Sequence, residues 1–311
     1  MLLVPSSPVS PVTPTVVLTI AGSDSGGGAG VQADLRTFAA LGLFATTAIT
    51  AVTAQNTVGV LAVEAMPPQL VIDQVEAVLD DLDPAAVKTG MLARPETVAA
   101  VAELAAAGRL PNLVVDPVLV SSTGHPLMDE GGIGAYRELL LPHAAIATPN
   151  LREAAALTNR SLKELASIEA MEAVAEELRA LGSQTVVVKG GHLRAAEASA
   201  AQTGPAAPAP SQLGSPDVVC SAKGVWRLSA ERVDTCNDHG TGCTLSAAIA
   251  GFLAQGADHL EAITRAKHFV HEAIRDAASW RLGAGHGPID HFGWARTGTL
   301  SKVTVARPVT K

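Results

Sequence analysis

Apolar stretches alternate along the chain with amphipathic stretches, and this rhythm predicts alternating strands and helices. Residues 16–21 form a short, apolar, β-branched run that is typical of a buried strand. In residues 31–42 the apolar side chains recur at helical spacing, and TVVVKGG at 185–191 is another run of strand type. Strands that are apolar throughout indicate a mostly parallel sheet with helices on both faces. The pattern therefore predicts the α/β class.

The same pattern assigns the remaining elements, including a late hairpin that turns at Lys223 and Gly224. Pro68 stands near the start of one predicted helix, a position that proline favours. The further predicted strands are 45–54, 85–90, 113–116 and 144–148, the hairpin is 217–229, and the further helices are 68–82, 95–108, 134–141, 150–158, 168–181, one from about 241 and one at 260–280.

The sequence shows no internal repeat, and its amino-acid composition does not change in a way that would mark a second domain. We therefore expect one domain at 15–292. Residues 1–14 contain four prolines and are expected to be a disordered extension. They carry no Lys or Arg, unlike a secretion signal. Residues 194–216 are rich in Ala, Pro, Ser and Gly and predict a flexible low-complexity insertion. Residues 293–311 are expected to be a C-terminal tail.

Composition narrows the class of protein further. Of 311 residues, 48% are hydrophobic and 17% charged, which excludes a disordered chain. The net charge of -8 argues against nucleic acid as a partner, because phosphate binding needs a basic face. No apolar run approaches the ~18 residues of a membrane-spanning helix. Three cysteines are too few for a disulfide framework, so we expect a reducing, cytoplasmic location.

The strongest local signal for chemistry is Gly240-Thr241-Gly242-Cys243, which an apolar helix follows at once. Glycines let backbone N–H groups converge, and a helix N-terminus adds partial positive charge, which together make an anion site for a phosphate. The same field lowers the pKa of a thiol in the first turn, here Cys243. A plain glycine-rich turn with a small buried cysteine explains the same residues.

A second glycine-rich segment, GSDSGGGAG at 22–30, also precedes a helix. It lacks the lysine of a GxxxxGK[ST] phosphate loop and does not fit GxGxxG. A structural turn is therefore as good an interpretation as a ligand loop.

Asn150 and Glu153 follow a predicted strand and stand three residues apart. This spacing is typical of a capping box at a helix start. Their oxygens could instead orient the water shell of Mg²⁺ beside a triphosphate.

Polar residues also close three strands, at Gln55, Asp116 and Lys189. The carboxyl ends of parallel strands are where α/β sheets bind ligands. A surface lysine and a polar turn are the alternatives for Lys189 and Gln55.

Seven motifs in order carry a resemblance to a known family. In sequence order they are TIAGSDSGGGAGVQADLRTFAALG, TAVTAQNTVGV, VKTGMLA, VVDPVLVSSTGHPLM, ATPNLREAAALT, VVVKGGHL and NDHGTGCTLSAAIA. Over about residues 16–280, and again in GAGHGPIDHF at 283–292, the chain resembles hydroxymethylpyrimidine/phosphomethylpyrimidine kinases. These are thiamine-pathway members of the ribokinase-like superfamily. The resemblance implies a ribokinase-like three-layer αβα sandwich with a mostly parallel central sheet.

The resemblance also implies an activity. Members use ATP and Mg²⁺ to phosphorylate 4-amino-5-hydroxymethyl-2-methylpyrimidine and then its monophosphate, in thiamine biosynthesis. It further implies a homodimer. Catalytic roles follow for Gly240, Thr241 and Gly242 as the anion hole, for Lys189 at the ATP phosphates, and for Cys243 where sugar-kinase relatives carry an aspartate base.

Binding roles follow in the same way. Gln55 matches the position that reads the ring nitrogen and amino group of the pyrimidine, and Gly22, Asp24, Ala29, Met91 and Val118 surround the same pocket. Asp116, Asn150 and Glu153 lie toward ATP and Mg²⁺, with the ion held mostly through water and phosphate near Asp116 and Glu153. Segment 118–128 corresponds to a lid.

Two other functions stay open. Some relatives phosphorylate pyridoxal and carry a second cysteine in the lid. The lid of this chain has none, which favours the pyrimidine. A non-catalytic pyrimidine sensor would be expected to lose Lys189 or the Gly-Thr-Gly-Cys loop, and both are present. Asp238 stands where many members have threonine, and the sequence leaves open which way it points.

Overall fold

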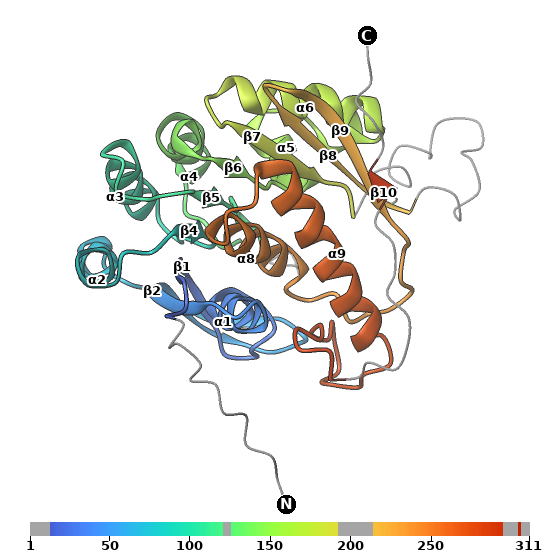
Figure 1. Cartoon of the computed structure of the whole chain (residues 1–311), viewed down its shortest axis with the longest axis horizontal. Helices are drawn as coiled ribbons and strands as arrows, with labels where there is room; N and C mark the ends of the chain where they lie inside the picture. Colours follow the sequence, from blue (N-terminus) through green and yellow to red (C-terminus); the bar gives the residue numbers. More distant parts are fainter. Residues whose placement is uncertain (1–12, 121–125, 192–213, 295–303, 306–311) are drawn as a thin grey trace, which may run out of the picture.

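A ten-stranded sheet forms the centre of the protein (Figure 1). The computed structural model describes residues 13–120, 126–191, 214–294 and 304–305. Across the sheet the strand order is β10-β9-β8-β7-β6-β5-β4-β1-β2-β3. The strands are β1 (Val16–Asp24), β2 (Phe44–Gln55), β3 (Val60–Ala65), β4 (Ala86–Thr89), β5 (Val114–Val115), β6 (Ile146–Ala147), β7 (Thr185–Lys189), β8 (Ser215–Ser221), β9 (Gly224–Ala230) and β10 (Thr304–Val305).

The middle of the sheet is parallel and its two margins are antiparallel. From β2 through β1, β4, β5 and β6 to β7, every neighbouring pair runs parallel. β3 pairs antiparallel with β2, and β8, β9 and β10 continue the other margin antiparallel. Parallel strands need helical crossovers, which cover both faces of the sheet and explain why these strands are apolar throughout. The carboxyl ends of the parallel strands therefore meet at one edge.

Helices form a layer on each face of the sheet (Figure 1). One layer consists of α1, α8 and α9, which pack on one another, and the other holds the remaining helices. The helices are α1 (Gly30–Ala40), α2 (Pro68–Leu82), α3 (Pro95–Ala106), α4 (Gly132–Ala135), α5 (Leu151–Leu157), α6 (Ile168–Ala180), α8 (Thr241–Ala254) and α9 (His259–Ala277), with the short π or 3₁₀ turns Tyr136–Leu140, Leu141–His143 and Leu162–Leu165.

Helix α8 is the buried centre of its layer. Its sequence is apolar on nearly all sides, and ten of its fourteen residues are buried. A helix that is apolar all round needs partners all round, and α8 finds them in β1, β4, β5, α1 and α9. Phe38 of α1 and Phe252 of α8 belong to this core. The packing places the N-terminus of α8 at the edge where the parallel strands end.

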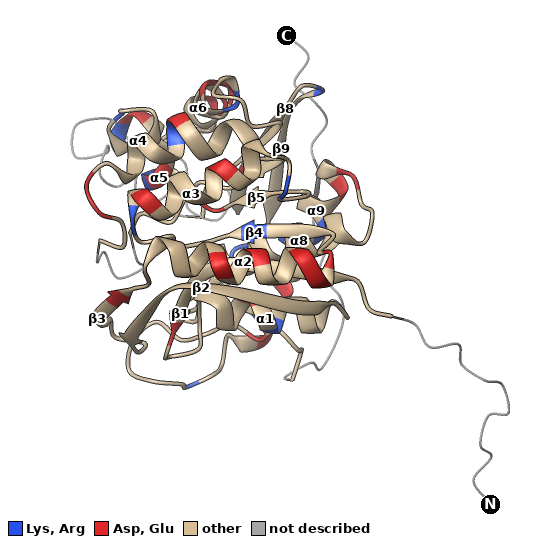
Figure 2. Ribbon diagram, turned by 90° about the vertical axis from the view of Figure 1, so that its left-hand side faces the viewer, with Lys and Arg blue, Asp and Glu red and all other residues tan. Residues whose placement is uncertain are grey.

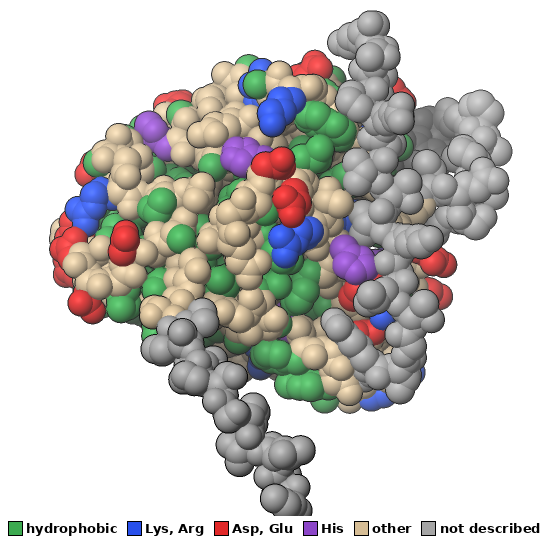
Figure 3. Space-filling model, viewed as in Figure 1, with side chains coloured by type: hydrophobic (Ala, Val, Ile, Leu, Met, Phe, Trp, Pro, Cys, Tyr) green, Lys and Arg blue, Asp and Glu red, His purple; other side chains and the backbone are tan. Residues whose placement is uncertain are grey.

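Charged residues lie mainly on the outside of the helices (Figure 2). Helix α2 carries four acidic residues and no Lys or Arg. On the face seen in Figure 3, side chains of both signs are interspersed with apolar ones. Within the described part of the chain, no helix has both the length and the apolar character needed to cross a membrane.

The predicted α/β class and the three-layer sandwich are confirmed, and α2 has the predicted bounds. Strand β3 was not predicted, because its short exposed run lacks a buried apolar pattern.

The insertion prediction was wrong at its end, since Ser215 and Pro216 already pair with β9, while 194–213 lie outside the described residues. Within the predicted tail, Thr304–Val305 pair with β9 and extend the sheet. Of the predicted N-terminal extension, residues 1–12 lie outside the description.

Candidate active site

A cavity of about 950 Å³ lies at the edge where the parallel strands end. Asp24, Gln55 and Lys189 are the last residues of β1, β2 and β7, so the sheet itself directs their side chains toward this edge. All fourteen residues that the sequence suggested line the cavity, namely Gly22, Asp24, Ala29, Gln55, Met91, Asp116, Val118, Asn150, Glu153, Lys189, Gly240, Thr241, Gly242 and Cys243. The structure thus brings together segments that are more than 200 residues apart in the chain.

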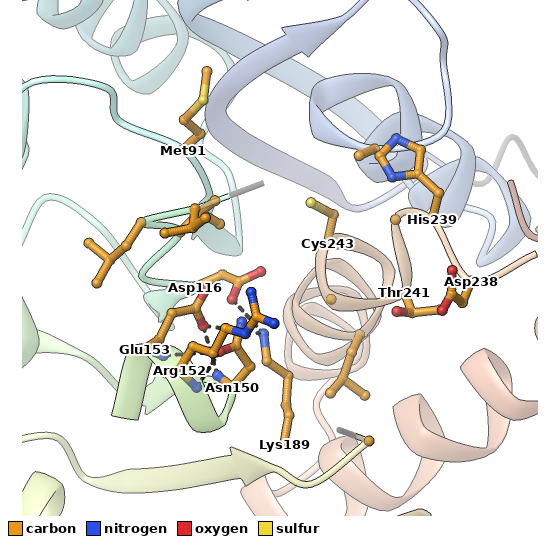
Figure 4. A pocket seen from close by; sticks show the side chains of 18 of the residues that line it. Met91, Asp116, Asn150, Arg152, Glu153, Lys189, Asp238, His239, Thr241 and Cys243 are labelled. Carbon is orange, nitrogen blue, oxygen red and sulfur yellow. Dashed lines mark hydrogen bonds and ion pairs between the residues drawn. The ribbon is translucent and has the colours of Figure 1, made fainter. Parts of the chain in front are cut away.

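One wall of the cavity holds a cluster of buried charges (Figure 4). The ammonium of Lys189 donates to Asp116 Oδ1 at 2.8 Å and lies 4.0 Å from Glu153 Oε2. Asp116 Oδ2 accepts a hydrogen bond from Ser246 of α8 at 3.1 Å. Asp116 and Glu153 are 1% and 4% exposed. The Lys189 side chain is 13% exposed and closely paired, so it is not a free surface lysine, which removes that alternative for Lys189.

The charges of this cluster shift one another's pKa values. Burial disfavours the Lys189 ammonium, but the carboxylates of Asp116 and Glu153 outweigh it and raise the pKa of Lys189 above its usual range. Burial also raises the pKa of Glu153 to about 7, with Lys189 opposing that rise and Asp116 adding to it. Lys189 is therefore a permanent cation, whereas Glu153 changes charge close to neutral pH.

Asn150 and Glu153 form the capping box of α5. The Asn150 side chain accepts from the backbone N–H groups of Arg152 and Glu153, and Glu153 Oε2 accepts from the Asn150 N–H at 2.7 Å. The capping interpretation is confirmed. The same geometry fixes both side chains in the cavity wall, so capping and ligand binding are compatible here.

The N-terminus of α8 forms the adjoining wall, where a Cβ at Gly242 would lie 3.3 Å from Nζ of Lys189. Gly240 is the N-cap residue and has φ +85°, a left-handed conformation that favours glycine. A Cβ at Gly240 would collide with the carbonyl oxygen of Gly28, so the two glycine-rich segments are in direct backbone contact. Thr241, Gly242 and Cys243 form the first turn of α8, where backbone N–H groups and the helix dipole favour an anion.

Asp24 ties the two glycine-rich segments together. Its carboxylate accepts backbone hydrogen bonds from Gly26, Gly28 and Ala29 at 2.8–3.1 Å, and Oδ2 lies 3.0 Å from Nε2 of His239. Burial alone would raise the pKa of Asp24, but the hydrogen bonds from His239 and the backbone outweigh it and lower the pKa. Segment 22–30 is therefore held in one conformation by hydrogen bonds. The pair between Asp24 and His239 joins it to the segment around His239.

Sequence reasoning missed His239 and Lys88. His239 Nε2 lies 3.0 Å from Asp24 and 3.3 Å from Nε2 of Gln55, so it bridges the two. Lys88 lies within β4 and pairs with Asp34 of α1, and both side chains are fully buried. Both residues stand within motifs of the family resemblance, NDHGTGCTLSAAIA and VKTGMLA, but residue type alone assigned neither a role. The sequence feature that could have drawn attention to Lys88 is a single lysine inside an otherwise apolar predicted strand, AAVKTG.

The expectation for the thiol of Cys243 was wrong in direction. Burial raises its pKa to about 11, although the ammonium of Lys88 and a backbone hydrogen bond from Gly30 act the other way. Desolvation at this position therefore outweighs the field of the helix N-terminus.

Two further segments complete the rim. Asp238 Oδ1 pairs with Nδ1 of His286 at 2.7 Å, and both side chains are about half exposed. Asp238 thus points along the rim toward His286. In the predicted lid, Val120 pairs with Pro126 in an antiparallel bridge, and the Leu127 N–H donates to the Leu119 carbonyl. Residues 121–125 of the lid lie outside the described residues.

The described residues offer no group of three or more His, Cys, Asp or Glu side chains that could hold a metal ion by themselves. Two buried carboxylates, Asp116 and Glu153, nevertheless line the same wall. Mg²⁺ commonly keeps several waters and takes one or two carboxylates together with substrate phosphates. The donor set therefore fits Mg²⁺ held mainly through water and phosphate.

Comparisons with known proteins agree with this geometry. A family model described as phosphomethylpyrimidine kinase matches residues 24–290. A hydroxymethylpyrimidine/phosphomethylpyrimidine kinase of Rhizobium meliloti (strain 1021) is 47% identical over 279 residues, covering 89% of this chain and 97% of the relative.

Two solved structures are also similar. Staphylococcus aureus pyridoxal kinase, in complex with AMP-PCP and pyridoxal, has a TM-score of 0.80 at 33% identity and covers 95% of this chain and 99% of its own. Phosphomethylpyrimidine kinase from Clostridium difficile 630 has a TM-score of 0.68 at 37% identity and covers 84% and 99%.

A mostly parallel sheet between helical layers, with a lysine and a helix N-terminus side by side at its carboxyl edge, defines an ATP-binding small-molecule kinase of the ribokinase-like class. Within that class, the chain belongs to the phosphomethylpyrimidine kinase family.

The pKa of Glu153 generates a prediction about stability. Because that pKa is raised from 4.5 to about 7, the folded protein holds the extra proton between these pH values. The contribution of Glu153 to stability is therefore present at low pH and is lost as the pH rises through about 7, by at most about 1.4 kcal/mol per pH unit. Glu153→Gln keeps the capping box. The variant should gain stability relative to the parent protein between pH 5 and 7.5, measured by urea unfolding.

Glu164→Gln is the matched control for this measurement. Glu164 closes a capping box on the exposed turn Leu162–Leu165, and the hydrogen bonds from Ser161 lower its pKa. This control should show no relative gain over the same pH range. If the stability curves of Glu153→Gln and the parent protein ran parallel, the charge change assigned to Glu153 would be wrong.

Proposed function

We propose that this protein uses ATP, with Mg²⁺, to phosphorylate the hydroxymethyl group of 4-amino-5-hydroxymethyl-2-methylpyrimidine and then the resulting monophosphate. The observation that carries the proposal is a single cavity in which Gln55 faces the same space as Lys189 and the N-terminus of α8. Membership of the phosphomethylpyrimidine kinase family supports this choice of substrate. The cavity, of about 950 Å³, has room for a nucleotide and a small heterocycle.

Gln55 is the proposed reader of the pyrimidine. A primary amide has one acceptor and one donor side by side, which matches an exocyclic amino group next to a ring nitrogen. Thr53 and His239 contact the amide of Gln55 at 3.2 and 3.3 Å and so restrict its rotation. We place Gly22, Asp24, Ala29, Met91 and Val118 around the ring, where Gly22 leaves room because a Cβ there would meet the end of Met91.

The phosphoryl group is proposed to lie between Lys189 and the first turn of α8. Phosphoryl transfer depends mainly on in-line positioning and on stabilising the charge of the equatorial oxygens. Gly240, Thr241 and Gly242 present backbone N–H groups, and the Lys189 ammonium adds positive charge beside them. Hydrogen bonding to Asp116 fixes the position of that ammonium.

Mg²⁺, when bound, would neutralise charge on the phosphate oxygens. Asp116 and Glu153 are the proposed acceptors for its water shell, and Asn150 holds the start of α5 in place beside them. Glu153 can supply negative charge there mainly above its pKa of about 7.

Cys243 is the proposed proton acceptor in the first phosphorylation. The acceptor hydroxyl must lose a proton as its oxygen bonds to phosphorus, and a thiolate at the start of α8 can receive it. In the second phosphorylation the acceptor is already a phosphate anion, so that step needs no base.

Separate assays of candidate acceptors test the substrate. With ATP and Mg²⁺, the hydroxymethyl pyrimidine and its monophosphate should both be phosphorylated with a higher kcat/KM than pyridoxal. ADP release measures all three reactions. Pyridoxal is included because pyridoxal kinases are among the similar structures. A clear preference for pyridoxal would refute the proposed substrate, and binding without turnover of any acceptor would indicate a sensor.

Cys243→Ala should separate the two phosphorylations. Loss of a general base commonly slows a reaction by 10²–10⁴, so we expect kcat with the hydroxymethyl acceptor to fall roughly a hundredfold or more. With the monophosphate acceptor the change should stay within roughly threefold. Cys236→Ala, which removes an exposed cysteine, is the control and should leave both rates unaltered. Equal losses on both acceptors would contradict the role of base.

We also propose that the protein is a homodimer and that it works in the cytoplasm. Its three free cysteines suit a reducing compartment. Strand β3 is an exposed sheet edge whose neighbourhood carries Val52, Val58 and Leu61 at 47%, 64% and 78% exposure, a surface that a second copy could cover.

Leu61→Glu should therefore weaken the dimer in sedimentation velocity. Leu282→Glu, at another exposed apolar site, should leave it intact. A monomeric parent protein at micromolar concentration would refute the dimer.

A further inference from the structure

A fully buried ion pair lies behind the floor of the cavity. Lys88 of β4 donates from Nζ to Asp34 Oδ2 of α1 at 2.8 Å, and both side chains have no exposed surface. Lys88 belongs to the wall of the cavity, yet it is closed to solvent, so it sits behind the first layer of atoms. A Cβ added at Gly90 would lie 2.8 Å from its ammonium and 3.0 Å from Ala21, which places Nζ just under the cavity lining.

Fold stability alone is a weak reason for such a pair. Exchanging a buried ion pair for apolar side chains of similar size is often neutral or stabilising, because removing two charges from water costs several kcal/mol per ion. The pair here is also incompletely satisfied: Thr19 donates to Asp34 Oδ2, but Oδ1 is buried without a hydrogen-bond partner. The carboxylate therefore takes both of its hydrogen bonds on one oxygen, and the pair is not a fully satisfied structural ion pair.

Cys243 is the nearby group whose negative charge this ammonium can stabilise. Helix α8 packs against β4, and both side chains border the same cavity. Four charged groups act on the thiol from the elements packed around it: Lys88 from β4, Asp34 from α1, Asp116 from the end of β5 and Lys189 from β7. Burial raises the pKa of the thiol, Lys88 opposes that rise most strongly, and Asp34 and Asp116 add to it.

We propose that Lys88 is a positioning residue for the first phosphoryl transfer, because its buried ammonium holds compensating positive charge behind the sulfur of Cys243. Asp34 in turn holds the ammonium in place. This inference rests on the proposed role of Cys243 as proton acceptor. It goes beyond that role by naming the group that allows a partly buried sulfur to carry negative charge.

The proposed step balances as follows. The thiol first releases its proton to solvent, and the resulting thiolate is stabilised by Lys88. The thiolate then takes the hydroxyl proton of the acceptor as the hydroxyl oxygen bonds to the γ-phosphorus of ATP. The bond between that phosphorus and the β,γ-bridging oxygen breaks. The products are a phosphomonoester, ADP and the neutral thiol.

Thiol alkylation tests the proposal without any kinase substrate. The rate of iodoacetamide reaction at Cys243, followed by mass spectrometry of its peptide, reports the thiolate fraction as a function of pH. Cys236→Ser is used as the background, because Cys236 is exposed and would react as well. At pH 8.5, Lys88→Met should slow alkylation roughly tenfold, which corresponds to a rise of about one unit in the thiol pKa. An unchanged pH profile in folded Lys88→Met would overturn the proposal.

Two further variants separate electrostatics from folding. Lys88→Met leaves Asp34 buried alone and can fail to fold, so the double variant Asp34→Asn/Lys88→Met supplies a neutral pair. It should shift alkylation in the same direction by a smaller factor. Lys267→Met is the matched control, because Lys267 forms another buried pair, with Asp217, at 2.7 Å. Alkylation of Cys243 should be unaffected in this control, and an equal slowing there would mean a general packing defect and would overturn the assignment.

Kinase assays supply the second readout. In Lys88→Met, kcat with the hydroxymethyl acceptor should fall roughly tenfold and its pH optimum should move upward, while the monophosphate acceptor should change by less than roughly threefold. Equal losses on both acceptors would overturn the role through Cys243. Because alkylation involves neither ATP nor pyrimidine, failure of the proposed substrate would leave that readout intact.

Discussion

The carboxylate of Asp24 is the interaction on which the site depends. It stands at the end of β1, between β4 and β2 in the sheet, and accepts three backbone N–H groups of its own loop while pairing with His239. This one group fixes the shape of segment 22–30 and joins it to the loop that starts α8. The backbone contact between Gly28 and Gly240 has room only because both residues lack a Cβ. Substrate reading and phosphate binding are thus held in one rigid frame.

The charged side chains of this protein differ in sign and role between its surface and its active site. The chain has a net charge of -8, yet the cations that matter are few and are enclosed by carboxylates. Lys189 and Lys88 each have an aspartate within 2.8 Å, and burial strengthens each interaction relative to water. A negative surface is therefore compatible with handling ATP, because the positive potential is needed only at the end of β7, behind β4 and at the start of α8.

The fold and the membership of the site could largely be predicted from the sequence. Apolar runs in alternation identified the parallel strands, and the position of polar residues at strand ends identified Asp116 and Lys189 as neighbours. Strand β3 and the pairing of Thr304–Val305 were not predicted, because short strands at the sheet margin show no strong pattern of apolar and polar residues. The roles of His239 and Lys88 could not be predicted, because they depend on hydrogen-bond partners that are 215 and 54 residues away in the sequence. The thiol pKa was misjudged because burial depth is a tertiary property that local sequence does not contain.

The link between Asp24 and His239 also has a consequence for how the protein is made. The two residues are separated by 215 positions, and β1 is the first strand to leave the ribosome. Its loop cannot reach its final shape until α8 has been synthesised and packed. For most of translation the partial chain therefore contains β1 without a working pocket. The active site closes as one of the last events in the biogenesis of the protein.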